Sequence, residues 1–148
     1  MSFNLFTYGV LMYDELLTLL TGKEFTSMPA VLPNHQRLTL VKDGWPRIPV
    51  VVPEESSSVR GVVIKGLDEV SIKILDEFED TEIDLYKRSK SIAILNSGAK
   101  IEVNLYVGGT SAKGCLSEEW HPTKFVDAHF DEYKNEIIPG FLKNRRIT

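Results

Sequence analysis

The sequence predicts a single α+β domain with five to seven short strands, three helices and one hydrophobic core. Three observations support this. The chain has 148 residues, 43% of them hydrophobic, which is enough for one ordinary core. Short segments with strand-like alternation fill much of the chain, and helical spacing of apolar residues recurs in three places. No internal repeat or linker divides the sequence, so we expect one domain over residues 1–148.

The first unit reads as strand, glycine turn and short helix. Residues 4–8 are rich in strand formers and end at Gly9. Asp14 is a good N-cap for the apolar stretch at residues 16–20. Gly22 is positioned to end that helix in the left-handed conformation.

Residues 27–65 change to short β segments. Residues 37–41 alternate, and residues 48–52 are β-branched but interrupted by prolines, which predicts an edge or irregular strand. Residues 54–58 read as a polar loop, and residues 59–65 as the next strand.

A helix follows, capped by Asp68, with Val70, Ile74 and Phe78 on one face. Residues 86–95 and 99–107 then form the best hairpin candidate in the sequence, joined by an Asn-Ser-Gly turn.

A third helix is expected to start at Pro122. Its apolar face would consist of Val126, Phe130, Tyr133 and Ile137. Pro139 and Gly140 are expected to end it, leaving residues 140–148 as a basic C-terminal tail.

Composition excludes several classes of protein. A formal net charge of -4 and a pI near 5.4 argue against a nucleic-acid binder. The single cysteine, Cys115, excludes an intramolecular disulfide and a cysteine-rich zinc site. The three histidines lack metal-ligand spacing, so no metal is expected. No apolar run exceeds four residues, so we expect no membrane span and a cytoplasmic protein.

The segment Tyr8-Gly9-Val10-Leu11 lies where a strand ends and a helix follows. Glycine allows a sharp turn and close approach of a ligand to the backbone, and the next N–H groups are free to point at an anion or a carbonyl oxygen. An ordinary β-to-α turn is the alternative interpretation.

Residues 76–84 carry six carboxylates at the C-terminal end of the second helix. That helix end has a partial negative charge, so the cluster breaks a local rule, and such violations concentrate at functional sites. Like-charge neighbours and the helix end both favour a raised carboxylate pKa, as a general base requires. Glu79 follows Phe78, which marks the buried face of the helix, and is therefore the acid best placed to lie beside apolar surface. A solvated acidic loop is the alternative.

These residues resemble the gamma-glutamyl cyclotransferase-like family, with the plant avirulence-induced-gene-like group as the most similar branch. Residues 6–11 (FTYGVL) are similar to its Y-G-[ST]-L signature. Residues 75–79 (LDEFE) and 86–88 (YKR) are similar to its L-D-x-[FY]-E and Y-x-R segments. Residues 45–48 and 59–63 resemble its aromatic-proline stretch and its V-x-G-x-[LV] strand, and the resemblance covers about residues 3–135.

The resemblance implies a small mixed β-barrel with surrounding helices and a cavity at one end. It implies that the backbone of Tyr8, Gly9, Val10 and Leu11 holds a glutamyl group, and that Glu79 is the catalytic acid and base. Tyr86 and Tyr106 would line the cavity.

The implied activity is acyl transfer that cyclises a small gamma-glutamyl compound to 5-oxoproline, with neither a metal nor an organic cofactor. Gamma-glutamyl amines are an alternative substrate type that differs only in the leaving group. Val10 stands where the signature has serine or threonine. An alternative is therefore a catalytically inactive relative that binds a small acidic ligand or a protein.

Overall fold

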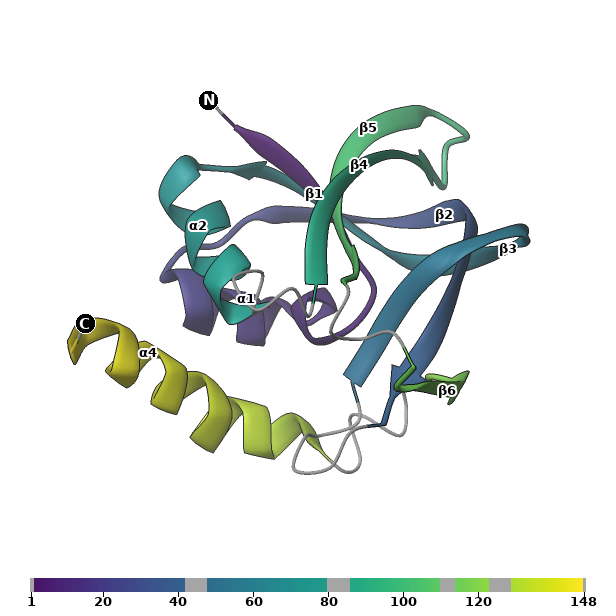
Figure 1. Cartoon of the computed structure of the whole chain (residues 1–148). Coiled ribbons are helices and arrows are strands. Elements are labelled where there is room, and N and C mark those ends of the chain that lie inside the picture. The colour runs from purple at the N-terminus through teal and green to yellow at the C-terminus, as the bar shows by residue number, and fades with distance from the viewer. Residues whose placement is uncertain (1, 42–47, 80–85, 110–113, 123–128, 148) are drawn as a thin grey trace.

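Five strands close into a mixed β-barrel (Figure 1). The computed structural model describes residues 2–41, 48–79, 86–109, 114–122 and 129–147. Pairing runs β1–β3–β2–β4–β5 and returns from β5 to β1. The β1–β5 and β3–β5 contacts are parallel and the other pairs antiparallel. The strands are β1 (Phe3–Thr7), β2 (Thr26–Leu40), β3 (Ile48–Leu67), β4 (Tyr86–Leu95), β5 (Lys100–Gly108) and β6 (Leu116–Glu119), the last of which pairs with β2 outside the ring.

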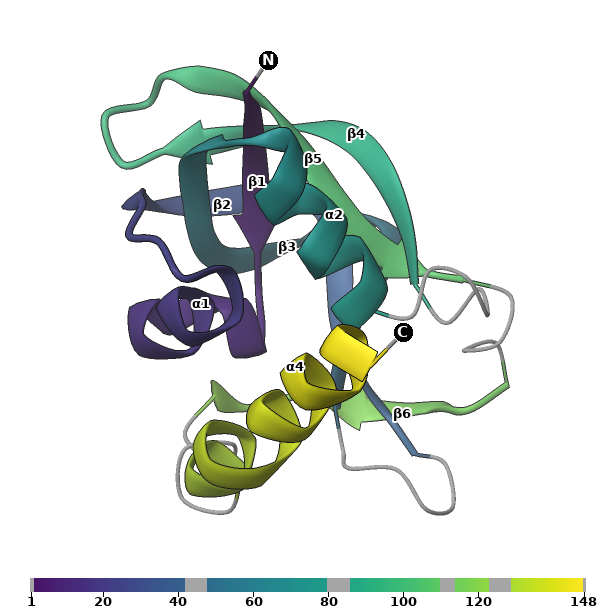
Figure 2. The same cartoon turned by 90° about the vertical axis from the view of Figure 1, so that its left-hand side faces the viewer.

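The helices gather on one side of the barrel (Figure 2). They are α1 (Asp14–Thr21), α2 (Glu69–Phe78), α4 (Ile138–Ile147), the 3₁₀ turn η1 (Val10–Met12) and the π-helix η4 (Tyr133–Ile137). No helix among the described residues is long and apolar enough to cross a bilayer. The expected α+β class and the barrel with surrounding helices are confirmed.

The barrel interior and the helical layer share one core. Fully buried side chains come from β1, α1, β2, β3, α2 and β5, including Phe6, Leu16, Leu32, Ile64, Leu75 and Leu105. Burial of a side chain of this kind contributes about 1.5–3 kcal/mol before the cost in conformational entropy. This core holds both β1 and α2 firmly, and most of the predicted site residues directly follow one of these two elements.

Several local predictions are confirmed. The hairpin spans β4 and β5, with Gly98 at φ 89° in its turn. Asp68 is the N-cap of α2 and accepts a 2.9 Å hydrogen bond from the Ser71 backbone N–H. Gly22 ends α1 at φ 72°. At the start of α1 the prediction was off by one residue, because Tyr13 is the N-cap and Asp14 the first helical residue.

Two segment predictions are wrong. The polar loop expected at residues 54–58 is extended backbone within β3, although the register with β2 jumps from Pro33–Ser58 to His35–Pro53. The shift in register lies opposite Asn34, whose φ is 62°. The polar residues 54–58 therefore form an irregularity within one long strand and do not separate two strands.

The helix predicted to stop at Pro139 instead continues through α4 to Ile147. Proline normally clashes with the preceding helical turn. Here Pro139 is the second residue of α4, close behind η4, whose i→i+5 bonding already departs from the α-helical pattern, as in the bond from the Ile138 N–H to the Tyr133 carbonyl. Most of the expected tail is therefore helical, whereas residues 123–128 of the predicted helix lie outside the described residues.

Candidate active site

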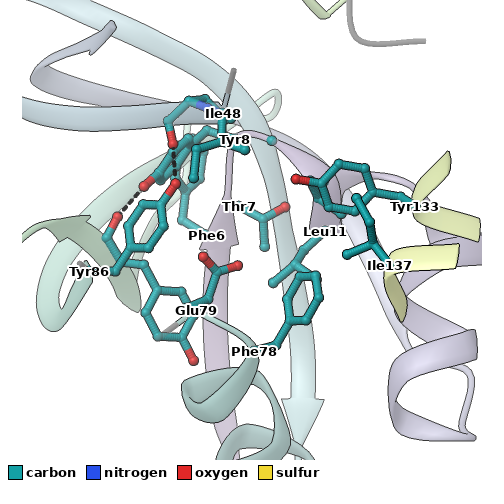
Figure 3. Close-up of a pocket in the computed structure, with 14 residues that line it drawn as sticks. Phe6, Thr7, Tyr8, Leu11, Ile48, Phe78, Glu79, Tyr86, Tyr133 and Ile137 are labelled. Atoms are coloured by element: carbon teal, nitrogen blue, oxygen red, sulfur yellow. Dashed lines mark hydrogen bonds between the residues drawn. The ribbon is translucent and has the colours of Figure 1, made fainter. Parts of the chain in front are cut away.

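A cavity of about 260 Å³ opens beside the end of β1 (Figure 3). Its walls come from β1, the turn after it, β3, α2, β4, β5 and η4. The lining residues are Phe6, Thr7, Tyr8, Gly9, Val10, Leu11, Ile48, Pro49, Phe78, Glu79, Tyr86, Tyr106, Tyr133 and Ile137. The structure thus brings every sequence-predicted site residue to one cavity, together with several that the sequence did not single out.

The turn after β1 presents backbone to this cavity. In this turn the Met12 N–H donates to the Gly9 carbonyl at 3.0 Å, and the Tyr13 N–H donates to the Val10 carbonyl. The N–H groups of Val10 and Leu11 therefore precede the first bonded donor of the turn. Gly9 packs so closely on Pro49 that an added Cβ would lie 2.4 Å from the proline ring. Glycine is needed here to bring the backbone up to the cavity wall.

Tyr8 is held at both ends. Its hydroxyl donates to the Tyr106 carbonyl, and its own carbonyl accepts a 2.9 Å hydrogen bond from the Arg37 guanidinium. The Arg37 guanidinium also lies 5.2 Å from the centre of the Trp120 ring. The Tyr8–Gly9 peptide is therefore anchored from β2, on which Arg37 lies, and Arg37 is a residue that the sequence analysis missed.

Glu79 lies at the C-cap of α2, where its N–H bonds the Leu75 carbonyl at 2.9 Å. The hydrophobic face of α2 orients the helix, and Phe78 and Glu79 then reach the cavity from its last turn. The partly buried carboxylate points toward Thr7 in Figure 3. Its charge acts on three tyrosines around the cavity, Tyr8, Tyr106 and Tyr133.

The other carboxylates of the predicted acidic cluster have different surroundings. Asp76 accepts from the Tyr106 hydroxyl at 2.6 Å and pairs with Arg88 at 3.3 Å. Glu77 pairs with Arg145. Asp80, Glu82 and Asp84 lie outside the described residues. Glu79 is therefore the member of the cluster, among those described, that lines the cavity.

Tyr86 and Tyr106 line the cavity with their rings, while their hydroxyls bond to protein. Tyr86 donates to the Pro49 carbonyl at 2.5 Å, a bond drawn in Figure 3. Tyr106 donates to Asp76 at 2.6 Å. Both rings are thereby locked, and their polar atoms have protein acceptors.

Thr7 is the polar lining residue that the sequence analysis missed. It is only 4% exposed, and its Oγ1 has no hydrogen-bond partner in the part of the chain that the structure describes. A buried hydroxyl without a partner costs free energy, and in a cavity it is available to a ligand. Its position directly before the Tyr-Gly pair was the one available sequence signal.

The cavity tyrosines give a testable pH dependence. Burial first, and the Glu79 charge second, raise the pKa of Tyr8 and Tyr133; burial and the bond to Asp76 raise that of Tyr106. These groups titrate at a higher pH in the folded chain than the ordinary value of 10.0, so the folded state retains their protons longer. Their contribution to stability is complete below pH 10 and is lost as the pH rises above it.

We expect unfolding at alkaline pH to coincide with tyrosinate formation. One pH titration, monitored by ultraviolet absorbance for tyrosinate and by circular dichroism for folding, checks this. In denaturant the same tyrosines should ionise near their ordinary pKa. Ionisation of all five tyrosines near pH 10 with an intact dichroism spectrum would contradict the prediction.

The closed five-stranded barrel has counterparts among solved structures. A protein titled gamma-glutamyl cyclotransferase aligns with a TM-score of 0.67 at 19% identity, over 80% of this chain and 70% of that one. An AIG2-like protein from Mus musculus aligns with a TM-score of 0.61 at 20% identity, over 82% and 86% of the two chains. At these identities the likeness shows the fold, which is that of the gamma-glutamyl cyclotransferases.

The sequence comparisons then give the family. The family described as "Gamma-glutamyl cyclotransferase, AIG2-like" matches residues 5–122. AIG2-like protein D of Arabidopsis thaliana is 30% identical over 142 residues, 95% of this chain and 84% of the relative. AIG2-like protein C of the same plant is 29% identical over 146 residues, 99% of this chain and 81% of the relative. The chain belongs to the AIG2-like gamma-glutamyl cyclotransferase family.

Proposed function

We propose that the protein is a gamma-glutamyl cyclotransferase-type acyltransferase that converts a small gamma-glutamyl compound into 5-oxoproline and a free amine. The observation that carries the proposal is that Glu79 lines the same cavity as the turn Tyr8–Leu11. A carboxylate that can move protons and a row of backbone donors are the two components that this reaction needs.

The reaction is an intramolecular ring closure. The substrate α-amine attacks its own γ-carbonyl carbon, forming the lactam C–N bond, and the bond to the leaving amine then breaks. Glu79 accepts a proton from the α-ammonium and returns a proton to the departing nitrogen. Two of the three ammonium protons end on the leaving amine, which departs as an ammonium ion. Because nucleophile and electrophile belong to one molecule, the cavity mainly has to hold the folded conformer.

The polar groups of β1 and the turn suit the glutamyl end. The donors for the oxyanion and the substrate carboxylate are the N–H groups of Val10 and Leu11 and the Thr7 hydroxyl, which has no partner among the described residues. Val10 is buried and packs in the core, which supports a role for position 10 through its backbone. Replacement of the family's serine or threonine by valine is compatible with such a role.

The test is release of 5-oxoproline from a panel of gamma-glutamyl amino acids, gamma-glutamyl amines and glutathione. We expect turnover of at least one member of the panel, with equal amounts of 5-oxoproline and amine. Absence of turnover by folded protein on the whole panel would overturn the proposal. Binding without turnover would favour an inactive family member that holds a small acidic ligand.

Arg37 is expected to act as a positioning residue for this reaction. The Tyr8 carbonyl and the Gly9 N–H belong to one trans peptide and point in opposite directions. The bond from Arg37 to that carbonyl therefore sets the direction of the Gly9 N–H. Arg37→Met should lower kcat about tenfold with a smaller change in KM, because the Tyr8–Gly9 peptide that leads into the Val10 and Leu11 donors loses its anchor while the cavity remains.

Two further variants separate positioning from stability. Arg37→Lys should recover part of the loss, since an ammonium can still reach the carbonyl. Arg60→Met removes an exposed neighbouring arginine and should leave kcat unchanged. An equal loss of kcat in all three variants, or a loss of kcat that correlates with a lower melting temperature, would contradict the positioning role.

A further inference from the structure

One wall of the cavity comes from a part of the chain beyond the matched family segment. The family match ends at residue 122, whereas Tyr133 and Ile137 belong to η4 and line the cavity with Phe78 of α2. In Figure 3 these two residues of η4 lie on the side of the cavity opposite Tyr86. The C-terminal helix therefore completes a site whose other described walls lie within the matched segment.

This wall is fixed in place by packing. Tyr133 is 4% exposed and makes an edge-to-face contact with Phe78, with ring centres 6.5 Å apart. Phe78 packs in the same way on Phe141 of α4, at 5.3 Å. Ion pairs join the helix to its neighbours, Lys134 to Glu15 at 2.6 Å and Arg145 to Glu77. The π-helical turn of η4 presents both Tyr133 and Ile137 to the cavity, and such turns are frequent at functional sites.

The wall is also chemically distinct from the rest of the cavity. The donors that suit a charged glutamyl group lie on β1 and the turn after it, and the hydroxyls of Tyr8, Tyr86 and Tyr106 already donate to protein acceptors. Among the described lining residues, Glu79 is the one carboxylate, and lysine, arginine and histidine do not occur. The part of the cavity left for the leaving group is therefore uncharged and mostly apolar, with the Tyr133 hydroxyl as its one polar side-chain group among the described residues.

This lining discriminates between leaving groups. A leaving amino acid would bring its carboxylate into an apolar site beside Glu79, without a cation among the described lining residues. Desolvation and like-charge repulsion both disfavour that arrangement. An uncharged hydrocarbon group would instead bury its surface against Phe78, Tyr133 and Ile137.

We propose that Phe78, Tyr133 and Ile137 form a leaving-group subsite that selects gamma-glutamyl amides of uncharged, apolar amines. This inference rests on the proposed cyclotransferase function. It assigns substrate choice to the C-terminal helix, and the glutamyl end and the chemistry to β1, its turn and Glu79.

The first experiment compares wild-type kcat/KM on gamma-glutamyl benzylamide, gamma-glutamyl ethylamide and gamma-glutamylalanine. We expect kcat/KM for gamma-glutamyl benzylamide to exceed that for gamma-glutamylalanine by at least tenfold, with the value for gamma-glutamyl ethylamide between them. If gamma-glutamylalanine were turned over as well as gamma-glutamyl benzylamide, the subsite would be overturned and the proposed function would stand. No turnover of any of the three, with turnover of another member of the panel, would also overturn the subsite, whereas no turnover on the whole panel would overturn both.

The second experiment moves a charge into the wall. Ile137 is partly exposed, so Ile137→Lys can direct its ammonium toward the cavity without burying it completely. We expect the benzylamide-to-alanine ratio to fall at least tenfold, because the new cation pairs with the leaving-group carboxylate. Asn135→Lys adds the same charge at an exposed position of η4 and should leave the ratio unchanged. An unchanged ratio in Ile137→Lys, or an equal fall in both variants, would contradict the subsite.

Discussion

Glu79→Gln is expected to lower kcat for 5-oxoproline release by about 10²- to 10⁴-fold, the usual contribution of a general acid and base. Glutamine keeps the shape and the polar atoms of the side chain but cannot accept the ammonium proton. KM should change much less, because the β1 turn and the apolar wall that bind the substrate remain. Steady-state kinetics on the best substrate of the panel, with 5-oxoproline measured directly, checks the prediction.

Glu69→Gln is the matched control for this variant. Glu69 also lies on α2 but is exposed in its first turn, away from the cavity. It should retain wild-type kcat, and the two variants should have similar circular dichroism spectra. Retention of more than about a tenth of wild-type kcat by Glu79→Gln would exclude Glu79 as the principal proton carrier.

Gly61→Ala is expected to lower the free energy of unfolding by about 4 kcal/mol or more, or to prevent folding. Gly61 lies on β3 beside β1, and an added Cβ would lie 2.2 Å from the Thr7 carbonyl oxygen and 2.7 Å from the Phe6 ring. The obstacle is the backbone of a paired strand, so β1 would have to move away from β3. Urea unfolding followed by circular dichroism measures the loss.

Gly140→Ala provides the opposite control. Gly140 lies in α4, and nothing lies within 4 Å of the position that its Cβ would occupy. Alanine should leave stability unchanged or raise it by up to about 1 kcal/mol through helix propensity. A Gly61→Ala protein within about 1 kcal/mol of wild type would contradict the close approach of β1 and β3.

Local patterns predicted much of the secondary structure. Alternation with a glycine turn located the β4–β5 hairpin, and a capping aspartate with helical spacing located α2. The errors occur where tertiary contacts override local preference. Pairing with β2 on both sides of the register shift, at Pro53 and at Ser58, keeps the intervening polar residues within β3, and the π-helical turn of η4 lets α4 continue through Pro139.

The lining of the cavity was predicted in part. Tyr8, Gly9, Val10, Leu11, Glu79 and Tyr86 were selected from a turn, an acidic cluster and the resemblance to a family, and all of them line one cavity. Thr7, Arg37 and Ile137 were not assigned to a site. Thr7 became notable only because its buried hydroxyl has no partner within the described parts of the chain, and Arg37 because it bonds the Tyr8 carbonyl across 29 positions of sequence.

The sequence by itself singled out the turn Tyr8–Leu11 and Glu79 as candidates, since a glycine turn after a strand and a carboxylate next to a phenylalanine on the apolar face of a helix are properties of neighbouring residues. Only the tertiary structure decided that this turn and Glu79 share a cavity, because barrel closure brings β1 and α2 together. The tertiary structure also decided that Phe78, Tyr133 and Ile137 meet in one wall of the cavity. Tyr133 follows Phe78 by more than fifty residues, and the two rings meet only because α4 packs across the end of α2.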